Sequence, residues 1–207
     1  NERGVPGYYY PLHITEEPQI ILDYFDKGYV TIIEIPFESL ELIKPLFDEI
    51  EDIHFNFVSL MYPNSFEIDF QLNGDSFKKK IDTDSGLFFS ASIKNETINE
   101  LANEADVQIG KDNKVALSFK SKEEIEKGQE GLFYNYLPTK QKSPFKYVDF
   151  HADFHTSVDR KTIEFDQKSK IGKYNAALLN ACVELYFNVL NNILAQENKQ
   201  ELVVKYV

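Results

Sequence analysis

The sequence has one cysteine, no tryptophan and no long uninterrupted run of apolar residues. A single cysteine, Cys182, excludes an intrachain disulfide framework. No run reaches the ~18 apolar residues that a bilayer span requires, and the first residues lack the pattern of a signal peptide. These absences predict a cytoplasmic protein with no membrane partner. Cys182 itself lies in the apolar run ALLNACVELYF without a motif that would activate a thiol, so we expect it in the core.

Positive charge is also scarce, because 22 Lys and Arg residues stand against 34 Asp and Glu residues and leave a net charge of −12. Such a surface repels phosphate backbones at long range, which disfavours generic nucleic-acid binding but leaves room for a local basic site. Hydrophobic residues make up 43% of the chain and aromatic residues 14%, so a packed core is expected and global disorder is excluded. The 207 residues suffice for one large domain, or for one domain and part of another.

Alternating apolar residues, β-branched runs and turn signals predict a series of strands. Asn73-Gly74 is a strong hairpin signal between two of them. Met61 lies in a short apolar run, residues 56–62, and is a core candidate. The expected strands occupy residues 28–37, 65–72, 76–83, 86–93, 115–119, 132–137 and 147–155.

Helical spacing predicts a helix after the capping residue Ser39, a short helix over residues 95–106 and a long helix over residues 171–196. The charged segment 120–129 is expected to be exposed. The basic run at residues 78–80 indicates a solvated strand end, with an anion contact as the alternative. The order of elements predicts an α+β fold with a mixed, mostly antiparallel sheet and helices on one face.

Two blocks of motifs occur in a fixed order. The first block, residues 7–37, ends in GYVTIIEIPF. That ending is similar to the last strand of the ATPase domain in the sacsin-like and heat-shock-protein-ninety-like branches of ATPases built on the GHKL (Bergerat) nucleotide fold. Ile35 stands where those branches have Leu before the proline.

The second block contains YLPTK, Pro144-Phe145, HADF and Ser157-x-x-Arg160. A Leu-Pro-Thr strand, a Pro-Phe turn, a His-Ala-Asp-Phe strand and a Ser-x-x-Arg turn occur in that order in bacterial relatives of the same branch. Residues 52–127 match only in their strand pattern.

The resemblance implies that residues 1–37 are the last part of an ATPase domain and residues 38–207 a middle, or transducer, domain. The implied fold of that domain is ribosomal-protein-S-five domain-two-like. The family's ATP-holding motifs are not visible here: the Mg-binding Asn, the Asp-x-Gly-x-Gly loop and the glycine-rich lid. The two glycines of residues 3–7 predict a plain turn.

The chain opens on Asn1 rather than Met and closes on an apolar segment, residues 200–207, so we interpret it as a piece of a longer polypeptide. The resemblance then implies a chaperone-like or mechanochemical ATPase. We expect ATP and Mg to bind the full-length protein and this chain alone to be inactive, with no cofactor. The implied partners are the protein's own N-terminal ATPase domain, protein clients and a second copy of the full-length protein.

In the family the middle domain supplies a cation to the terminal phosphate of ATP, and phosphoryl transfer depends on positioning and charge neutralisation. Arg160 is the first candidate, because it lies in a polar turn after the HADF strand and a guanidinium binds phosphate oxygens in a fork. Lys140, expected in a loop, is the second candidate and Lys161 the third. The competing interpretation pairs Arg160 with a surface carboxylate, Asp159, Asp153 or Glu164.

Two further interpretations stay open. The pattern His151-x-Asp153-x-His155 could hold zinc or manganese. However, residues four apart on a strand lie about 13 Å from each other, so we expect a polar strand face without a metal. The other is a non-enzymatic protein-interaction module within a larger cytosolic protein.

Overall fold

The computed structural model describes residues 19–28, 39–52, 55–61, 66–72, 75–81, 87–93, 96–108 and 114–195. The chain divides into two compact units, Asn1–Ile43 and Lys44–Val207. Helix α1 (Gln19–Asp26), which the sequence did not predict, belongs to the first unit. The strand expected over residues 28–37, apart from Gly28, and the turn expected at residues 3–7 lie outside the described residues.

Helix α2 (Leu40–Asp52) and a β-hairpin confirm the predictions of a helix after Ser39 and of two strands paired as a hairpin. Strands β1 (Phe66–Leu72) and β2 (Asp75–Ile81) pair antiparallel, with Phe70 opposite Phe77. The ring of Phe77 stacks on Phe70 at 4.8 Å and meets Phe47 of α2 edge-on at 4.9 Å. In the basic run, Lys78 donates to Glu67 at 2.7 Å, in agreement with a solvated strand.

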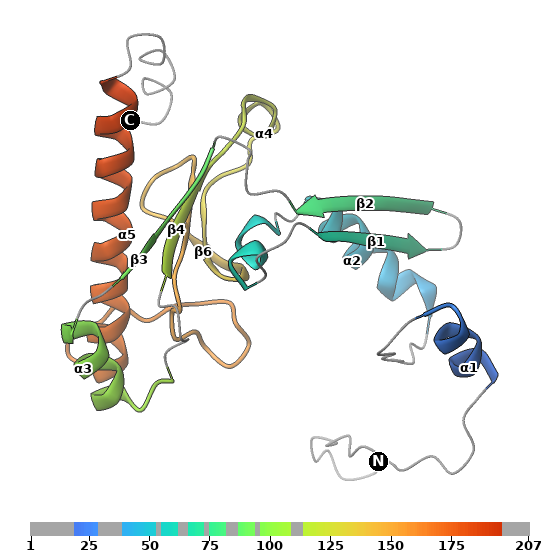
Figure 1. Ribbon diagram of the computed structural model, residues 1–207, viewed down its shortest axis with the longest axis horizontal. Helices are drawn as coiled ribbons and strands as arrows, with labels where there is room; N and C mark the ends of the chain where they lie inside the picture. The colour runs from blue at the N-terminus through green and yellow to red at the C-terminus, as the bar shows by residue number, and fades with distance from the viewer. Residues whose placement is uncertain are drawn as a thin grey trace. The chain divides into compact units, whose positions relative to one another are not determined.

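The second unit contains a five-stranded sheet in the order β3-β4-β7-β5-β6, of which β3, β4 and β6 carry labels in Figure 1. All neighbours in it are antiparallel except β5 and β7, which run parallel. The mixed sheet and its helices confirm the α+β class. The strands are β3 (Phe88–Ser92), β4 (Lys114–Phe119), β5 (Leu132–Asn135), β6 (Leu137–Lys142) and β7 (Val148–His151).

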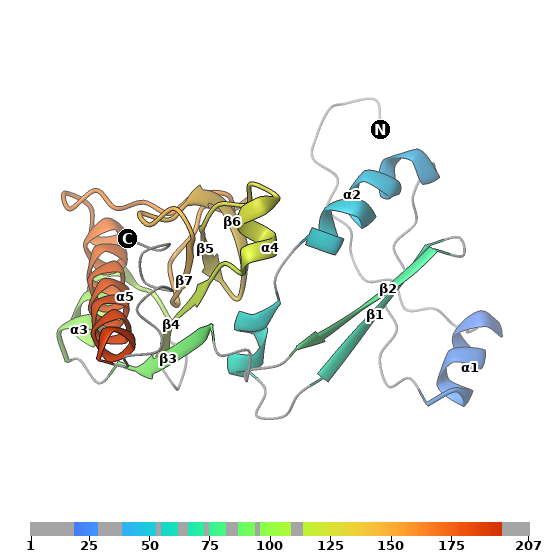
Figure 2. The same ribbon diagram turned by 90° about the horizontal axis from the view of Figure 1, so that it is seen from above.

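Helices α3 (Glu96–Ala105) and α5 (Lys170–Leu194) lie side by side on one face of this sheet (Figure 2). Strand alternation directs Leu117 and Phe150 towards them, and Leu178 and Cys182 of α5 are fully buried against this face. The core position of Cys182 is therefore confirmed. Burial raises the pKa of its thiol, so Cys182 stays protonated.

Gly172, in the first turn of α5, is required by close packing. A Cβ atom at this position would lie 1.9 Å from the carbonyl oxygen of Asp166, which no side chain can tolerate. The preceding Ser169 caps the helix, because its hydroxyl accepts from the backbone N–H of Gly172. Of the described helices, α5 alone has the length and apolar composition to cross a membrane, a test that core helices of soluble proteins also meet.

The opposite face of the sheet is covered by a short 3-10 helix, η1 (Asn56–Met61). Phe57 of η1 is fully buried against Tyr134 and His151, with ring centroids 4.7 Å and 5.3 Å away. The expectation that Met61 is a core residue is wrong, since 54% of it is exposed. With three residues per turn, Phe57 and Leu60 share the inward side of η1 and Met61 falls outside it.

Lys120 is an exception to the prediction that residues 120–129 are exposed, which holds for Lys122, Glu123 and residues 126–128. Its side chain is buried, and its Nζ lies 2.7 Å from Oδ2 of the equally buried Asp149. The adjoining helix α4 (Lys122–Glu126) begins with a capping box, in which Ser121 and Glu124 each bind the backbone N–H of the other. Glu124 also lies 3.5 Å from Lys120, so one cation bridges two carboxylates. Because Lys120 lies in a polar segment, its burial against the carboxylates of Asp149 and Glu124 was not predictable from that segment.

Candidate functional site

The strand expected over residues 132–137 is interrupted at Tyr136, between β5 and β6. Tyr136 has a φ of +60°, a left-handed conformation that costs a non-glycine residue roughly 1 kcal/mol or more. Its backbone N–H donates to Nδ1 of His151, 3.1 Å away. The sharp reversal leaves the backbone carbonyl of Asn135 at the tip of the turn, where it accepts a hydrogen bond from Arg160.

The strand expected over residues 147–155 ends at His151, and the chain continues into a loop. Within this loop residues 156–163 form a tight turn, closed by an antiparallel bridge between Thr156 and Ile163. Ser157 donates from its backbone N–H to the carbonyl of Thr162 and accepts from the N–H of Arg160, each at 2.8 Å. Arg160 itself has a φ of +58°, so its position at the turn carries the same backbone strain as Tyr136.

The carboxylate of Asp159 organises the same turn. It accepts from the hydroxyl of Ser157 at 2.6 Å and pairs with Nζ of Lys161 at 3.0 Å. The Ser157 hydrogen bond, with further contributions from Lys161, lowers the pKa of Asp159 to about 2. Asp159 is therefore ionised at neutral pH, and its ion pair is made with Lys161.

Arg160, unlike Lys161, binds a backbone carbonyl. Its Nη2 donates to the backbone carbonyl of Asn135 at 2.7 Å, and the side chain is exposed. Within the described ranges no carboxylate forms an ion pair with Arg160. Among those residues the surface pairing with Asp159, Asp153 or Glu164 is thus not made, and a guanidinium with spare donors faces solvent.

Lys140 lies in β6 and not in the loop predicted for it. The strand continues because the turn of residues 156–163 adds to its edge. The backbone N–H of Lys140 donates to the carbonyl of Lys161 at 2.9 Å, and the side chain of Gln141 accepts from the N–H of Ile163 at 2.6 Å. Ile163 is buried, which anchors the turn. This pairing brings Lys140, Arg160 and Lys161 to one exposed corner, the cationic corner, although Lys140 and Lys161 are 21 residues apart in the sequence.

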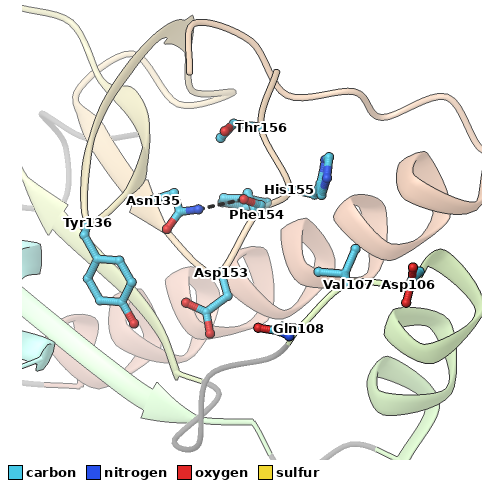
Figure 3. A pocket seen from close by; sticks show the side chains of 9 residues that line it. All are labelled: Asp106, Val107, Gln108, Asn135, Tyr136, Asp153, Phe154, His155 and Thr156. Atoms are coloured by element: carbon cyan, nitrogen blue, oxygen red, sulfur yellow. Dashed lines mark hydrogen bonds between the residues drawn. The ribbon is translucent and has the colours of Figure 1, made fainter. Parts of the chain in front are cut away.

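A cavity of about 540 Å³ is lined in part by Asn135, whose backbone carbonyl accepts from Arg160 (Figure 3). The side chain of Asn135 crosses its rim and donates to the carbonyl of Phe154 at 2.8 Å. Asp106 and Asp153 contribute carboxylates, so the cavity repels phosphate and does not extend the cationic corner. The lining residues are Asp106, Val107, Gln108, Asn135, Tyr136, Asp153, Phe154, His155 and Thr156.

The structure separates the three residues of the metal interpretation. His151 is buried under η1, Asp153 lies beyond the end of β7, and the side chain of His155 is exposed. Burial lowers the pKa of His151 to about 3 against the opposing effect of a hydrogen bond with the Tyr134 backbone, so its imidazole is neutral. No group of three His, Cys, Asp or Glu side chains that could hold a metal occurs among the described residues.

No family model, no curated protein and no solved structure matches this chain. The likeness to GHKL ATPases therefore depends on the motifs quoted above. Sequence reasoning found the three cations but missed Asn135 and Tyr136, the residues that hold Arg160. The left-handed Tyr136 left no signal, because glycine or asparagine is the usual residue in that conformation.

Proposed function

We propose that this chain is the coupling, or transducer, domain of a GHKL-type ATP-driven protein of chaperone-like or mechanochemical function. In this proposal Arg160 supplies a cation to the terminal phosphate of ATP held by a preceding ATPase domain together with Mg. The transducer-like assignment of the five-stranded sheet is part of the same proposal.

The main observation in support of this function is the environment of Arg160. The guanidinium is exposed, it is held by a backbone carbonyl rather than by a carboxylate of the described residues, and its backbone is strained. Strain of this kind persists only where surrounding contacts enforce it, and it concentrates at ligand-binding sites. A guanidinium held by one donor keeps others directed outward for a forked contact with phosphate oxygens.

The local charge supports an anionic partner. The chain carries a net charge of −12, yet the cationic corner holds Lys140, Arg160 and Lys161, and the carboxylate of Asp159 pairs with Lys161. Lys161 is neutralised by Asp159, whereas Lys140 is exposed. We therefore rank Arg160 first, Lys140 second and Lys161 third as ligands of a phosphate.

Hydrolysis of ATP by the protein that includes the preceding ATPase domain tests this function. We expect activity in that protein and none in the 207-residue chain. We expect Arg160→Ala to slow turnover by about a hundredfold or more while ATP still binds, as removal of one charge-stabilising donor does elsewhere. Lys122→Ala, a change at an exposed lysine of α4, is the matched control and should leave turnover unchanged.

A protein-interaction module is the second candidate, and Val158 favours it. This apolar side chain is fully exposed at the tip of the turn, beside Asp159 and Arg160. Docking of a partner would remove this apolar surface from water, which favours association. If the longer protein binds no ATP, the transducer assignment is wrong and a partner docking on Val158 is the better account.

A further inference from the structure

We propose that His151 is the positioning residue for Arg160, acting from the buried face of the sheet through the turn at Asn135 and Tyr136. In this proposal His151 does not touch the guanidinium of Arg160 directly. The proposal rests on the proposed function only where Arg160 binds the terminal phosphate of ATP. The positioning of Arg160 by His151 is a separate claim about the geometry of this chain.

Two hydrogen bonds, joined by the peptide unit between Asn135 and Tyr136, make up the proposed link. Nδ1 of His151 accepts from the backbone N–H of Tyr136 at 3.1 Å. This bond holds Tyr136 in its left-handed conformation, which no glycine is present to favour. The neighbouring carbonyl of Asn135 is thereby fixed, and it accepts from Nη2 of Arg160 at 2.7 Å. Loss of the acceptor on His151 removes a contact that offsets the strain at Tyr136.

His151 is itself held from three directions. The ring of Phe57 stacks on it at 5.3 Å with an interplanar angle of 20°, and the ring of Tyr136 lies 4.7 Å away. Its backbone carbonyl accepts from Sγ of Cys182 in α5 at 3.5 Å. The imidazole is therefore fixed in place, and being neutral it offers a lone pair on Nδ1.

Two substitutions of His151, by asparagine and by phenylalanine, distinguish the role of its Nδ1 acceptor from the role of its ring in packing. In His151→Asn the side-chain oxygen replaces Nδ1 as an acceptor at the same distance from the backbone. In His151→Phe the ring that packs on Phe57 is retained, but the acceptor is lost. A role in packing alone predicts that the phenylalanine variant is the milder one, and a role in positioning predicts the reverse.

The arginine signals of the chain give a direct readout. The sequence has only two arginines, Arg3 and Arg160, so their side-chain N–H signals in a ¹⁵N-labelled sample can be assigned with Arg160→Lys. A hydrogen bond from Nη2 slows rotation of the guanidinium and separates its N–H signals at low temperature. We expect separated signals for Arg160 in the unmodified chain and in His151→Asn, and their loss in His151→Phe. Separated signals that persist in a folded His151→Phe chain would overturn the proposal.

A second measurement requires no variant and covers the case in which His151→Phe does not fold. A hydrogen bond from N–H to N transmits a scalar coupling between the two nitrogens. We expect a cross-peak between the backbone nitrogen of Tyr136 and Nδ1 of His151 in the unmodified chain. Absence of the coupling together with rapid exchange of the Tyr136 amide would contradict the link.

ATP turnover separates this proposal from the proposed function. In the ATP-hydrolysing protein we expect His151→Phe to lower kcat towards that of Arg160→Ala without changing nucleotide affinity, and His151→Asn to restore much of it. If the protein does not hydrolyse ATP, the proposed function fails while the arginine signals still decide the positioning role. Unchanged kcat in His151→Phe, where Arg160→Ala is impaired, would refute the positioning role alone.

Discussion

The two faces of the five-stranded sheet are buried by different chemistry. Towards α3 and α5 the sheet presents apolar side chains such as Leu117 and Phe150. Towards η1 it presents Asp149, His151 and the hydroxyl of Tyr134, all nearly inaccessible to solvent. The first face stabilises the fold through burial of area, which tolerates many substitutions of similar volume. The second face depends on directional contacts, and these fix the backbone that leads to Arg160.

Among the changes that test this comparison, the largest effect is expected from Lys120→Met, which leaves the buried carboxyl group of Asp149 without its cation. Removing one partner of a buried ion pair costs about 3–5 kcal/mol, and we expect about 4 kcal/mol here. Urea unfolding followed by circular dichroism measures the loss. Lys122→Met, whose pair with Glu126 is exposed at 3.6 Å, should cost under about 1 kcal/mol. Equal losses of unfolding free energy in the two variants would show that the face of the sheet towards η1 does not depend on the buried ion pair.

On the apolar face the matching change is Leu178→Ala. Leu178 is fully buried in the core between α5 and the sheet, so its truncation should lower the free energy of unfolding by about 3 kcal/mol. Leu194→Ala, on the same helix but 43% exposed, is the control and should cost under about 1 kcal/mol. Arginine signals of Arg160 should be unchanged in Leu178→Ala, and a change there would mean that the apolar face also positions the site.

Acid should lower the free energy of unfolding through His151, which lies on the face of the sheet towards η1. The pKa of this imidazole is lowered from 6.5 to about 3 in the folded chain. As the pH falls below 6.5, the unfolded chain therefore binds a proton that the folded chain does not, and the free energy of unfolding decreases. The decrease amounts to at most about 2 kcal/mol between pH 6.5 and 5. Unfolding curves at several pH values should show a smaller decrease in His151→Asn, and parallel pH profiles would contradict this assignment.

The smallest effect is expected at the start of α4. Ser121→Ala removes the hydroxyl that accepts from the backbone N–H of Glu124, which should cost about 1 kcal/mol. Because Glu124 also contacts Lys120, part of this loss should disappear when it is measured in a Lys120→Met background. Ser90→Ala, at an exposed position of β3, serves as the control. Strictly additive losses would show that α4 and the buried ion pair are independent.

Periodicity sufficed for the apolar face of the sheet. The spacing of Leu178, Cys182 and their neighbours predicted α5 to within two residues at either end, and the apolar run at residues 115–119 predicted β4 to within one residue. Such patterns report burial of area, which is what this face depends on. The α+β class followed from the same information.

The polar face was not predictable in this way. A buried Lys120 reads as a surface charge until its partner, Asp149, is known to lie on a neighbouring region of the sheet. The break at Tyr136 depends on an acceptor 15 residues later in the chain, and no local propensity favours it. Arg160 and Lys140 were identified from motifs, but their placement at one corner required the pairing of residues 156–163 with β6.

The side-chain signal of Arg160 tests the transducer role most directly. It should be recorded in the protein that includes the preceding ATPase domain, with a non-hydrolysable ATP analogue and with ADP, and assigned by Arg160→Lys. We expect the Nε–H signal of Arg160 to shift with the ATP analogue and to remain in place with ADP, because only the analogue has the terminal phosphate. The same signal for both nucleotides, each bound at saturation, would show that Arg160 does not reach that phosphate.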